Sequence, residues 1–302
     1  MKPLLLALVA FVVLLTACTD GDTTEPTVTD SEPEAVPETT TTQATLPPDD
    51  TERAVVEGVL DGDSLRVILN GGSEEVRLRG INAPERDECF AEEARSALTN
   101  LVAGVEVAML AGEEDRDGNG RLLRYVYIEG TAGPTLVNEA LLRDGFAVAI
   151  QNGHELQAEF KDLENRSYAS GIGMWATFAC GQPEGGAPDR PQLRVADVSY
   201  DPAGDDTGSL DDEWVEIVNE SYGTVNMSGW TVRDESSSNR FVLPSTSVNP
   251  GNTLRIVTGC GTDGGGILHW CSDTPVWNND GDTVILQDEL GNTVDHWPYA
   301  GS

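Results

Sequence analysis

The sequence predicts a β-rich protein with two folded domains, a small closed barrel with three helices and then an all-β sandwich. Three observations support this prediction. Residues 54–181 combine short strand patterns with three stretches of helical spacing, residues 193–302 contain strand patterns alone, and a Gly/Pro-rich linker at 182–192 separates them. A chain of 302 residues has room for two ordinary domains once its N-terminal region is set aside.

Residues 1–17 have the pattern of a signal peptide. A basic start at Lys2 precedes an apolar run from Leu4 to Leu15, which is too short to span a bilayer with ease, and small residues precede Cys18. This pattern is typical of a lipoprotein, in which Cys18 becomes the lipidated N-terminus. The alternative is a cleaved secretory signal with an incidental cysteine. Both readings predict export, and the first predicts a protein anchored to the outer face of the cell membrane.

Residues 18–53 are expected to form a disordered tether. The segment is rich in Thr, Pro, Asp and Glu and contains no aromatic residue. Such a composition cannot bury enough apolar surface to offset the conformational entropy of the chain. We therefore expect the first folded domain to begin at Ala54.

The cysteine count fits an exported chain. Five cysteines are an odd number, which becomes even once Cys18 is assigned to lipid. Exported proteins can keep disulfides, so we pair the other four by neighbourhood, which keeps each bond within one domain. The expected pairs are Cys89 with Cys180 and Cys260 with Cys271, although four cysteines allow three connectivities.

The first domain alternates between strand and helix patterns. Period-two apolar spacing predicts strands, and a helical face with Phe90, Ala94, Leu98 and Leu101 predicts the first helix. Gly145 and Gly171 are placed to end the second and third helices. Strands closed into a small barrel with three helices fit an OB-fold. The expected strands are 54–60, 63–69, 76–81, 105–110, 121–130 and 146–150, and the expected helices are 89–102, 135–145 and 154–171.

The second domain has strand periodicity throughout. Gly, Asn, Asp and Pro separate the strand patterns, and no long helical pattern occurs. Several short strands with these turns argue for an immunoglobulin-like sandwich of two sheets. The expected strands are 192–200, 213–219, 229–234, 240–244, 252–259, 282–288 and 292–297.

Net charge argues against a polyanionic partner. The formal charge is −34, which repels nucleic acid at long range. This objection weakens at high salt or with divalent cations, because screening lengths then shrink to a few Å.

One acidic pattern occurs in both domains. Residues 61–64 read Asp-Gly-Asp-Ser, and residues 280–283 read Asp-Gly-Asp-Thr. Asp-Gly is ordinary turn chemistry, so neither tetrad is informative alone. Only the first is followed by an arginine, Arg77, and a proline turn at 81–85, so we interpret the second as a hairpin.

A third acidic segment, residues 115–120, matches the start of an EF-hand loop. The loop needs a bidentate Glu at its twelfth position, where Val126 stands, and no flanking helices support it. We reject the calcium loop and retain Arg121, which follows it, as a candidate site residue.

Together these motifs resemble the staphylococcal nuclease (thermonuclease) family over about residues 54–176. The matching segments are DGDS at 61–64, VRLRGINAPE at 76–85, DRDGNGRLLRYVY at 115–127, LVNEALLRDGFA at 136–147 and GMW at 173–175. Residues 193–298 resemble a lamin-tail domain through EWVEIVN, VNMSGWTVRD, VNPGNTLRIV and WNNDGDTVILQDELGNTVD. The second resemblance indicates a fold rather than an activity.

The first resemblance implies a Ca²⁺-dependent endonuclease that acts on DNA, with RNA as a further candidate substrate. Asp63, Asn82 and the backbone carbonyl of Ala83 would hold Ca²⁺ through oxygen atoms. Glu85 would orient or deprotonate the attacking water. The remaining two candidates, Arg77 and Arg121, would clamp the scissile phosphate and neutralise the charge that builds up in the transition state.

Three departures from the family pattern predict weaker binding. Position 82 is Asn where the family usually has Asp, which removes one charge from the metal site, so Asn82→Asp is expected to tighten Ca²⁺ binding. Asn119 and Gln151 stand where aromatic residues usually stack on bases, a contact of about 1 to 3 kcal/mol per base. Lysines are also missing from the surrounding segments.

Two other functions compete with a nuclease. One is a nucleic-acid-binding module that has lost catalysis, and the other is a cell-surface interaction protein in which the sandwich binds a partner. Retention of Asp63, Arg77, Glu85 and Arg121 argues against the first. Neither the partner of the sandwich nor the oligomeric state has a signature in the sequence.

Overall fold

The computed structural model describes residues 50–130, 133–182, 192–202, 208–236 and 238–301. Every described residue belongs to one compact unit. The expected signal peptide, Cys18 and most of the tether and linker lie outside the described residues. Within the described ranges, no helix has the length and apolarity needed to cross a membrane.

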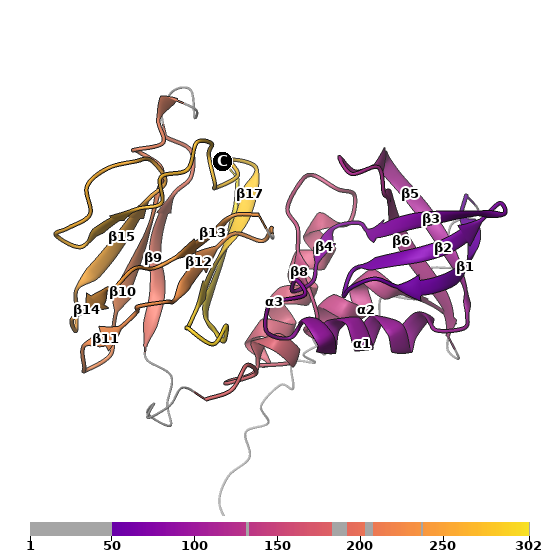
Figure 1. The fold of residues 1–302 in the computed structure, drawn as a ribbon, viewed down its shortest axis with the longest axis horizontal. Coiled ribbons are helices and arrows are strands. Elements are labelled where there is room, and N and C mark those ends of the chain that lie inside the picture. Colours follow the sequence, from indigo (N-terminus) through magenta and orange to yellow (C-terminus); the bar gives the residue numbers. More distant parts are fainter. Residues whose placement is uncertain (1–49, 131–132, 183–191, 203–207, 237, 302) are drawn as a thin grey trace, which may run out of the picture. The chain divides into compact units, whose positions relative to one another are not determined.

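The first domain is a five-stranded barrel with three helices (Figure 1). The strand order is β3-β2-β1-β5-β6, and a parallel pairing of β3 with β6 closes the barrel, while β7 extends it beyond β6. The other neighbouring strands are antiparallel. The strands are β1 (Glu52–Val59), β2 (Ser64–Leu69), β3 (Gly72–Leu78), β5 (Glu106–Arg116), β6 (Leu122–Gly130) and β7 (Gly133–Leu136).

Helices and a short strand pair complete this domain. Helix α1 (Ala91–Val102) buries Ala94, Leu98 and Val102 at helical spacing in the same core as the barrel strands. The short strands β4 (Ile81–Asn82) and β8 (Val148–Ala149) pair with each other beside the barrel. The other helices are α2 (Val137–Arg143), α3 (Gln157–Ala169) and a 3-10 turn, η1 (Gly173–Trp175).

The second domain contains two four-stranded sheets, ordered β16-β15-β10-β9 and β13-β12-β17-β18. Alternate residues of both sheets, including Val195 and Ile217 from one and Val232 and Leu286 from the other, share one buried core. The strands are β9 (Leu193–Ser199), β10 (Trp214–Asn219), β11 (Val225–Asn226), β12 (Thr231–Arg233), β13 (Arg240–Val242), β14 (Ser247–Val248), β15 (Thr253–Val257), β16 (Ile267–His269), β17 (Gly281–Gln287) and β18 (Thr293–Ala300).

The predicted fold class is confirmed, with differences at element boundaries. β5 continues to Arg116 through a segment expected to be a loop, because its hairpin pairing with β6 extends to Leu122. β7, β11, β14 and β16 were not predicted, since each has only two to four residues and so too short a pattern to recognise. The hairpin expected at 280–283 is wrong, because β17 pairs with β12 and β18 and not with the strand that precedes it.

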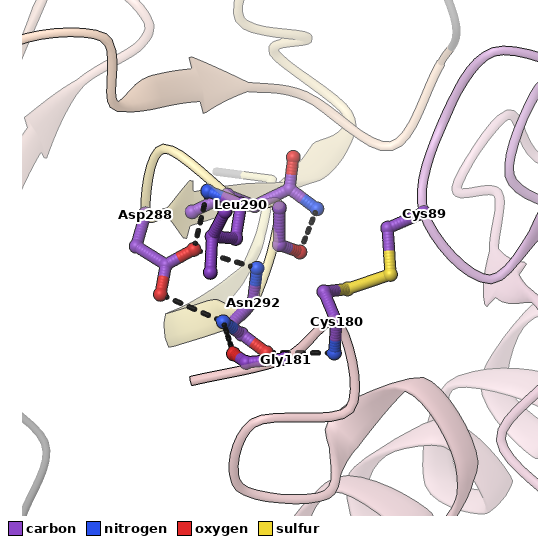
Figure 2. The surroundings of a disulfide bond; sticks show 8 residues. Cys89, Cys180, Gly181, Asp288, Leu290 and Asn292 are labelled. Carbon is purple, nitrogen blue, oxygen red and sulfur yellow. Dashed lines mark hydrogen bonds between the residues drawn. A yellow bond between two sulfur atoms is a disulfide. The ribbon is translucent and has the colours of Figure 1, made fainter. Parts of the chain in front are cut away.

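Two disulfides match the pairing expected by neighbourhood. Cys89, just before α1, is bonded to Cys180, and Cys260 is bonded to Cys271. Figure 2 shows that Asn292 contacts the chain next to the first bond: it accepts a hydrogen bond from the Cys180 amide and donates one to the Gly181 carbonyl, both at 2.8 Å. The first disulfide therefore holds a segment of the barrel domain that the sandwich also contacts.

Candidate active site

Asp63 lies at the centre of the candidate site, immediately before β2. Its amide donates to the Asp61 carboxylate at 3.0 Å, which forms the tight turn expected of the tetrad. Gly62 is needed there, because a Cβ atom at this position would lie 2.5 Å from the Cβ of Ala83. The turn thus presses Asp63 into the barrel, where it is only 5% exposed.

Arg77 lies opposite the start of β2 and binds Asp63. The register of the β2–β3 pair places Arg77 beside Ser64. Its Nη2 atom lies 3.0 Å from Asp63 Oδ2, and its Nη1 atom donates to the carbonyls of Leu78 and Ile81 at 3.1 and 2.7 Å. Both terminal nitrogens of the guanidinium are therefore held by this domain.

Asn82 is linked to Asp63 through Arg77, and Ala83 contacts Asp63 through its backbone amide. Asn82, on β4, is buried and accepts a hydrogen bond from Arg77 Nη2 at 2.8 Å. The Ala83 amide donates to Asp63 Oδ2 at 2.7 Å. The proline turn that the sequence singled out therefore closes directly over the carboxylate of Asp63.

Arg121 reaches the same place because the barrel closes. It directly precedes β6, whose parallel pairing with β3 aligns Leu123 with Arg77. Arg121 Nη1 donates to Ser64 Oγ at 3.4 Å, and the same hydroxyl donates to Asp63 Oδ1 at 2.9 Å. The two arginines are thus joined through Ser64 and Asp63.

Asp117 holds Arg121 from its other side. Its carboxylate lies 2.7 Å from Arg121 Nε and accepts hydrogen bonds from the amides of Asn119 and Arg121. All of these bonds lie within the turn that joins β5 to β6.

Glu85 does not join the hydrogen-bonded cluster. Its side chain is exposed on the turn that carries Asn82 and Ala83, and its amide donates to Glu88 Oε2 at 3.0 Å. Within the described part of the chain, its carboxylate has no hydrogen bond or ion pair. The carboxylate is therefore free to bind a water molecule at the rim of the site.

Burial raises the pKa of Asp63 to about 6. The nearby charge of Asp61 acts in the same direction, while Arg77 and hydrogen bonds from Ala83 and Ser64 oppose it. The carboxylate is thus costly to ionise in the absence of a second cation, and a cation bound beside it would lower its pKa.

The candidate ligands all offer oxygen atoms, which suit a hard cation. A carboxylate, the Asn82 amide oxygen and the Ala83 carbonyl are the ligand types that Ca²⁺ prefers. Only one of the three is charged, and in the described ranges no group of three or more His, Cys, Asp or Glu side chains could hold a metal. These donors fit Ca²⁺, but the single carboxylate compensates only one of the two positive charges of the ion.

A buried polar network next to the site was missed by the sequence analysis. Arg79, to which we assigned no role, is buried and donates to Glu155 Oε2 at 3.2 Å. Tyr125 contacts the same carboxylate oxygen at 2.9 Å and His154 Nδ1 at 2.8 Å. An arginine two residues after Arg77, and the adjacent His-Glu pair at 154–155, were the available signals.

This network favours an ionised Glu155. Partial burial alone would raise the pKa of Glu155, but hydrogen bonds from backbone amides and Tyr125, together with the charge of Arg79, lower it to about 2. Burial lowers the pKa of His154, which favours its neutral form. The network therefore holds Arg79 as a structural cation, away from Asp63.

Arg86 is a second missed cation. Of the arginines in the described ranges, it alone has no ion pair or hydrogen bond, which is unusual in so acidic a chain. It lines a cavity of about 220 Å³ together with Asp61, Pro84 and Arg95. This cavity adjoins the turn that contains the candidate metal ligands.

The sandwich also reaches the site, which no sequence pattern indicated. Glu235, after β12, accepts a hydrogen bond from Asn82 Nδ2 through its backbone carbonyl at 3.2 Å. Its carboxylate accepts a hydrogen bond from the Gln151 amide. The family resemblance predicts a base-stacking aromatic residue at the position of Gln151. Gln151 instead contacts Glu235 and Thr283 of the sandwich.

Comparisons with known proteins match each of the two domains to a family. Residues 75–177 match the family described as Staphylococcal nuclease homologue, and residues 187–301 match the Lamin Tail Domain. The chain is 32% identical over 130 residues to Protein ParB of Escherichia coli, covering 41% of this chain and 72% of that protein. It is 30% identical over 128 residues to Micrococcal nuclease of Shigella flexneri, covering 41% and 74%. Endonuclease YncB of Bacillus subtilis is 33% identical over 99 residues, covering 30% and 45%.

Proposed function

The chain belongs to the staphylococcal nuclease family, and we propose that it is an exported, membrane-anchored, Ca²⁺-dependent endonuclease. Its substrate would be the phosphodiester backbone of DNA, with RNA as a second candidate. The observation that carries this proposal is the convergence of two arginines near Asp63, Arg77 through the β2–β3 register and Arg121 through barrel closure. Two arginines beside a buried carboxylate suit phosphate binding next to a cation.

Each candidate residue has a proposed role. Asp63, the Asn82 amide oxygen and the Ala83 carbonyl would hold Ca²⁺, which when bound polarises a phosphoryl oxygen. Arg77 and Arg121 would donate hydrogen bonds to the non-bridging oxygens of the phosphate as their charge increases. Because both guanidiniums bind protein groups in the structure, we expect them to exchange some of those bonds for phosphate oxygens.

Glu85 would act on the attacking water. Its position three residues after Asn82 and its exposed carboxylate support this role. A carboxylate that accepts a proton from water must have an oxygen free for that hydrogen bond, as Glu85 has within the described residues. The same exposure means that Glu85 contributes little to folding.

A cleavage assay with variants tests the proposed function. Wild-type protein should cleave plasmid DNA with Ca²⁺ and lose activity with a chelator, and Glu85→Gln should lower turnover by roughly 10². Glu93→Gln, which alters an exposed carboxylate on α1, is the matched control and should leave turnover unchanged. A fully active Glu85→Gln protein would make Glu85 a turn residue, and absence of cleavage with any divalent cation would refute the nuclease.

Export and anchoring rest on the N-terminal pattern alone. We propose that Cys18 is lipidated after cleavage of residues 1–17 and that 18–53 tether the two domains to the membrane. Cys18→Ser should then move the protein from the membrane fraction to the medium. A variant that still partitions into detergent would show that another feature anchors the chain.

A further inference from the structure

Asn82 has a side-chain orientation that the contacts determine. Arg77 Nη2 lies 2.8 Å from one terminal atom of the amide, and arginine can only donate hydrogen bonds, so that atom must be oxygen. The amide nitrogen therefore points to the other side, where the carbonyl oxygen of Glu235 lies at 3.2 Å. Asn82 thus joins the barrel site to the sandwich.

Glu235 is itself firmly held. Only 2% of it is exposed, and its carboxylate accepts hydrogen bonds from the Gln151 amide and, at 3.5 Å, from Thr283 Oγ1. Gln151 follows β8 closely, and β8 pairs with the strand that carries Asn82. The backbone carbonyl and the carboxylate of Glu235 therefore bind two neighbouring segments of the barrel domain.

Other contacts keep this part of the sandwich in place. Lys161 on α3 donates to Thr283 and lies 2.7 Å from Glu164, while Glu88 pairs with Arg233 at 3.3 Å. Asn292 binds the backbone beside the Cys89–Cys180 disulfide. Glu235 therefore lies within a polar interface that several other contacts between the two domains also stabilise.

These contacts give a reason for asparagine at position 82. An aspartate would have no hydrogen to donate, and it would place an oxygen against the carbonyl oxygen of Glu235 in a buried position. Asparagine satisfies both neighbours, with its oxygen toward Arg77 and its nitrogen toward Glu235. Asn82 and Gln151, which both depart from the family pattern, are thus both contacted by the sandwich.

We infer that the lamin-tail sandwich contributes to the nuclease site, in which Glu235 is a positioning residue that fixes the Asn82 amide oxygen toward Arg77. Partners that orient a metal ligand typically change metal affinity by about 10- to 100-fold when they are removed. The calcium part of this inference rests on the proposed function, whereas the contact itself does not.

The test uses the full chain and three variants. Glu235→Ala removes the carboxyl group that anchors the turn. Glu235→Gln cannot ionise but keeps an acceptor for the Gln151 backbone amide, and Glu220→Ala removes an exposed carboxylate elsewhere in the sandwich. Ca²⁺ affinity is measured by calorimetry, and amide hydrogen exchange is measured at Gln151. Thermal unfolding shows that each variant is folded.

We expect Glu235→Ala to speed exchange at Gln151 and to weaken Ca²⁺ binding, each by roughly tenfold. Glu235→Gln and Glu220→Ala should stay close to wild type. Faster exchange with unchanged Ca²⁺ affinity would reduce Glu235 to a packing residue, and equal losses in the Ala and Gln variants would show a charge effect; either result overturns the inference.

A second comparison tests the link to position 82. Asn82→Asp adds a charged ligand but loses the hydrogen bond to the backbone carbonyl of Glu235. Glu235→Ala keeps this carbonyl but releases the turn that holds it in place. The gain in Ca²⁺ affinity from Asn82→Asp should therefore be larger in the Glu235→Ala background than in wild type. Equal gains would mean that the two residues act independently, contrary to the inference. Ca²⁺ binding without cleavage would refute the proposed function alone, whereas a wild-type chain that binds no Ca²⁺ would refute both.

Discussion

The two Asp-Gly-Asp-hydroxyl tetrads are nearly identical in sequence and differ in their surroundings. In both, the second aspartate is buried and raised in pKa, to about 6 for Asp63 and about 7 for Asp282. Asp63 has an arginine at 3.0 Å, whereas Asp282 accepts hydrogen bonds from the neutral groups of Asn278 and Thr283. Within the described residues, a cation paired directly with the second aspartate is what distinguishes the first tetrad from the second.

This difference arises from the folds that contain the tetrads. In the barrel, the neighbouring strand β3 places Arg77 opposite Ser64, and closure adds Arg121. In the sandwich, β17 lies in a sheet between β12 and β18, and its start faces the interface with the barrel domain. A turn motif thus becomes chemically useful only where neighbouring strands bring complementary groups to it.

The largest expected effect comes from removing the cation that distinguishes the first tetrad. Arg77→Ala should lower cleavage by roughly 10² to 10³, because it removes a phosphate donor. It should also destabilise the protein by about 3 to 5 kcal/mol, since Asp63 is left buried without its partner. Cleavage rates and urea unfolding measure the two effects.

Arg66→Ala is the control for that variant. Arg66 lies on β2, and its ion pair with Glu75 is largely exposed, so the substitution should change neither property appreciably. If the Arg77→Ala protein cleaved DNA as fast as the Arg66→Ala protein, Arg77 would not contact the phosphate.

A second test concerns Lys161, the cation beside the second tetrad. Lys161 binds Thr283 and lies 2.7 Å from the buried Glu164. Burial alone would raise the pKa of Glu164, but the charges of Lys161 and His296 lower it to about 2. Lys161→Met should therefore cost about 3 kcal/mol of unfolding free energy at pH 6.

The pH dependence of this loss has a definite sign. Because the folded-state pKa of Glu164 lies below its ordinary value of 4.5, its stabilisation is complete above pH 4.5 and is lost as pH falls toward 2. The difference between wild type and Lys161→Met should shrink from pH 6 to pH 3 in urea titrations. A difference that stays constant over this range would contradict the assignment.

Asp282→Asn should produce a smaller effect, and the pH dependence of stability that it removes has the opposite sign to that of Glu164. Burial, aided by the charge of Asp234, raises the folded-state pKa of Asp282, so its contribution to stability is present below pH 3.8 and is lost as pH rises toward 7. Between pH 5 and 8, wild type should lose about 1 to 2 kcal/mol more stability than Asp282→Asn. Parallel stability curves would show that Asp282 ionises normally.

The smallest effect concerns the hydroxyl of the first tetrad. Ser64→Ala removes the group that links Arg121 to Asp63, a loss of about 1 kcal/mol that should lower kcat roughly fivefold. Ser73→Ala, which removes an exposed hydroxyl on β3, should not change kcat. An unchanged kcat in Ser64→Ala would mean that Arg121 is positioned by Asp117 alone.

Much of the fold follows from local pattern. Alternation in segments such as 63–69 and 213–219 predicts strands because successive side chains on a strand face opposite sides, and the spacing of Ala94 and Leu98 predicts α1 for the corresponding helical reason. The motif residues Asp63, Arg77 and Arg121 were also recognisable, since each lies at or near a strand end next to a turn. These features depend on neighbours within a few residues along the chain.

The sequence by itself thus determined two β-rich domains, the motifs of a nuclease family and a plausible cysteine pairing. Tertiary structure alone decided that one tetrad meets an arginine, that Arg79 turns to Glu155, and that Glu235 of the sandwich binds Asn82. Those three contacts join residues between 14 and 153 positions apart in the chain. The physical reason is that such pairs depend on strand register, barrel folding and domain packing, which no local periodicity encodes.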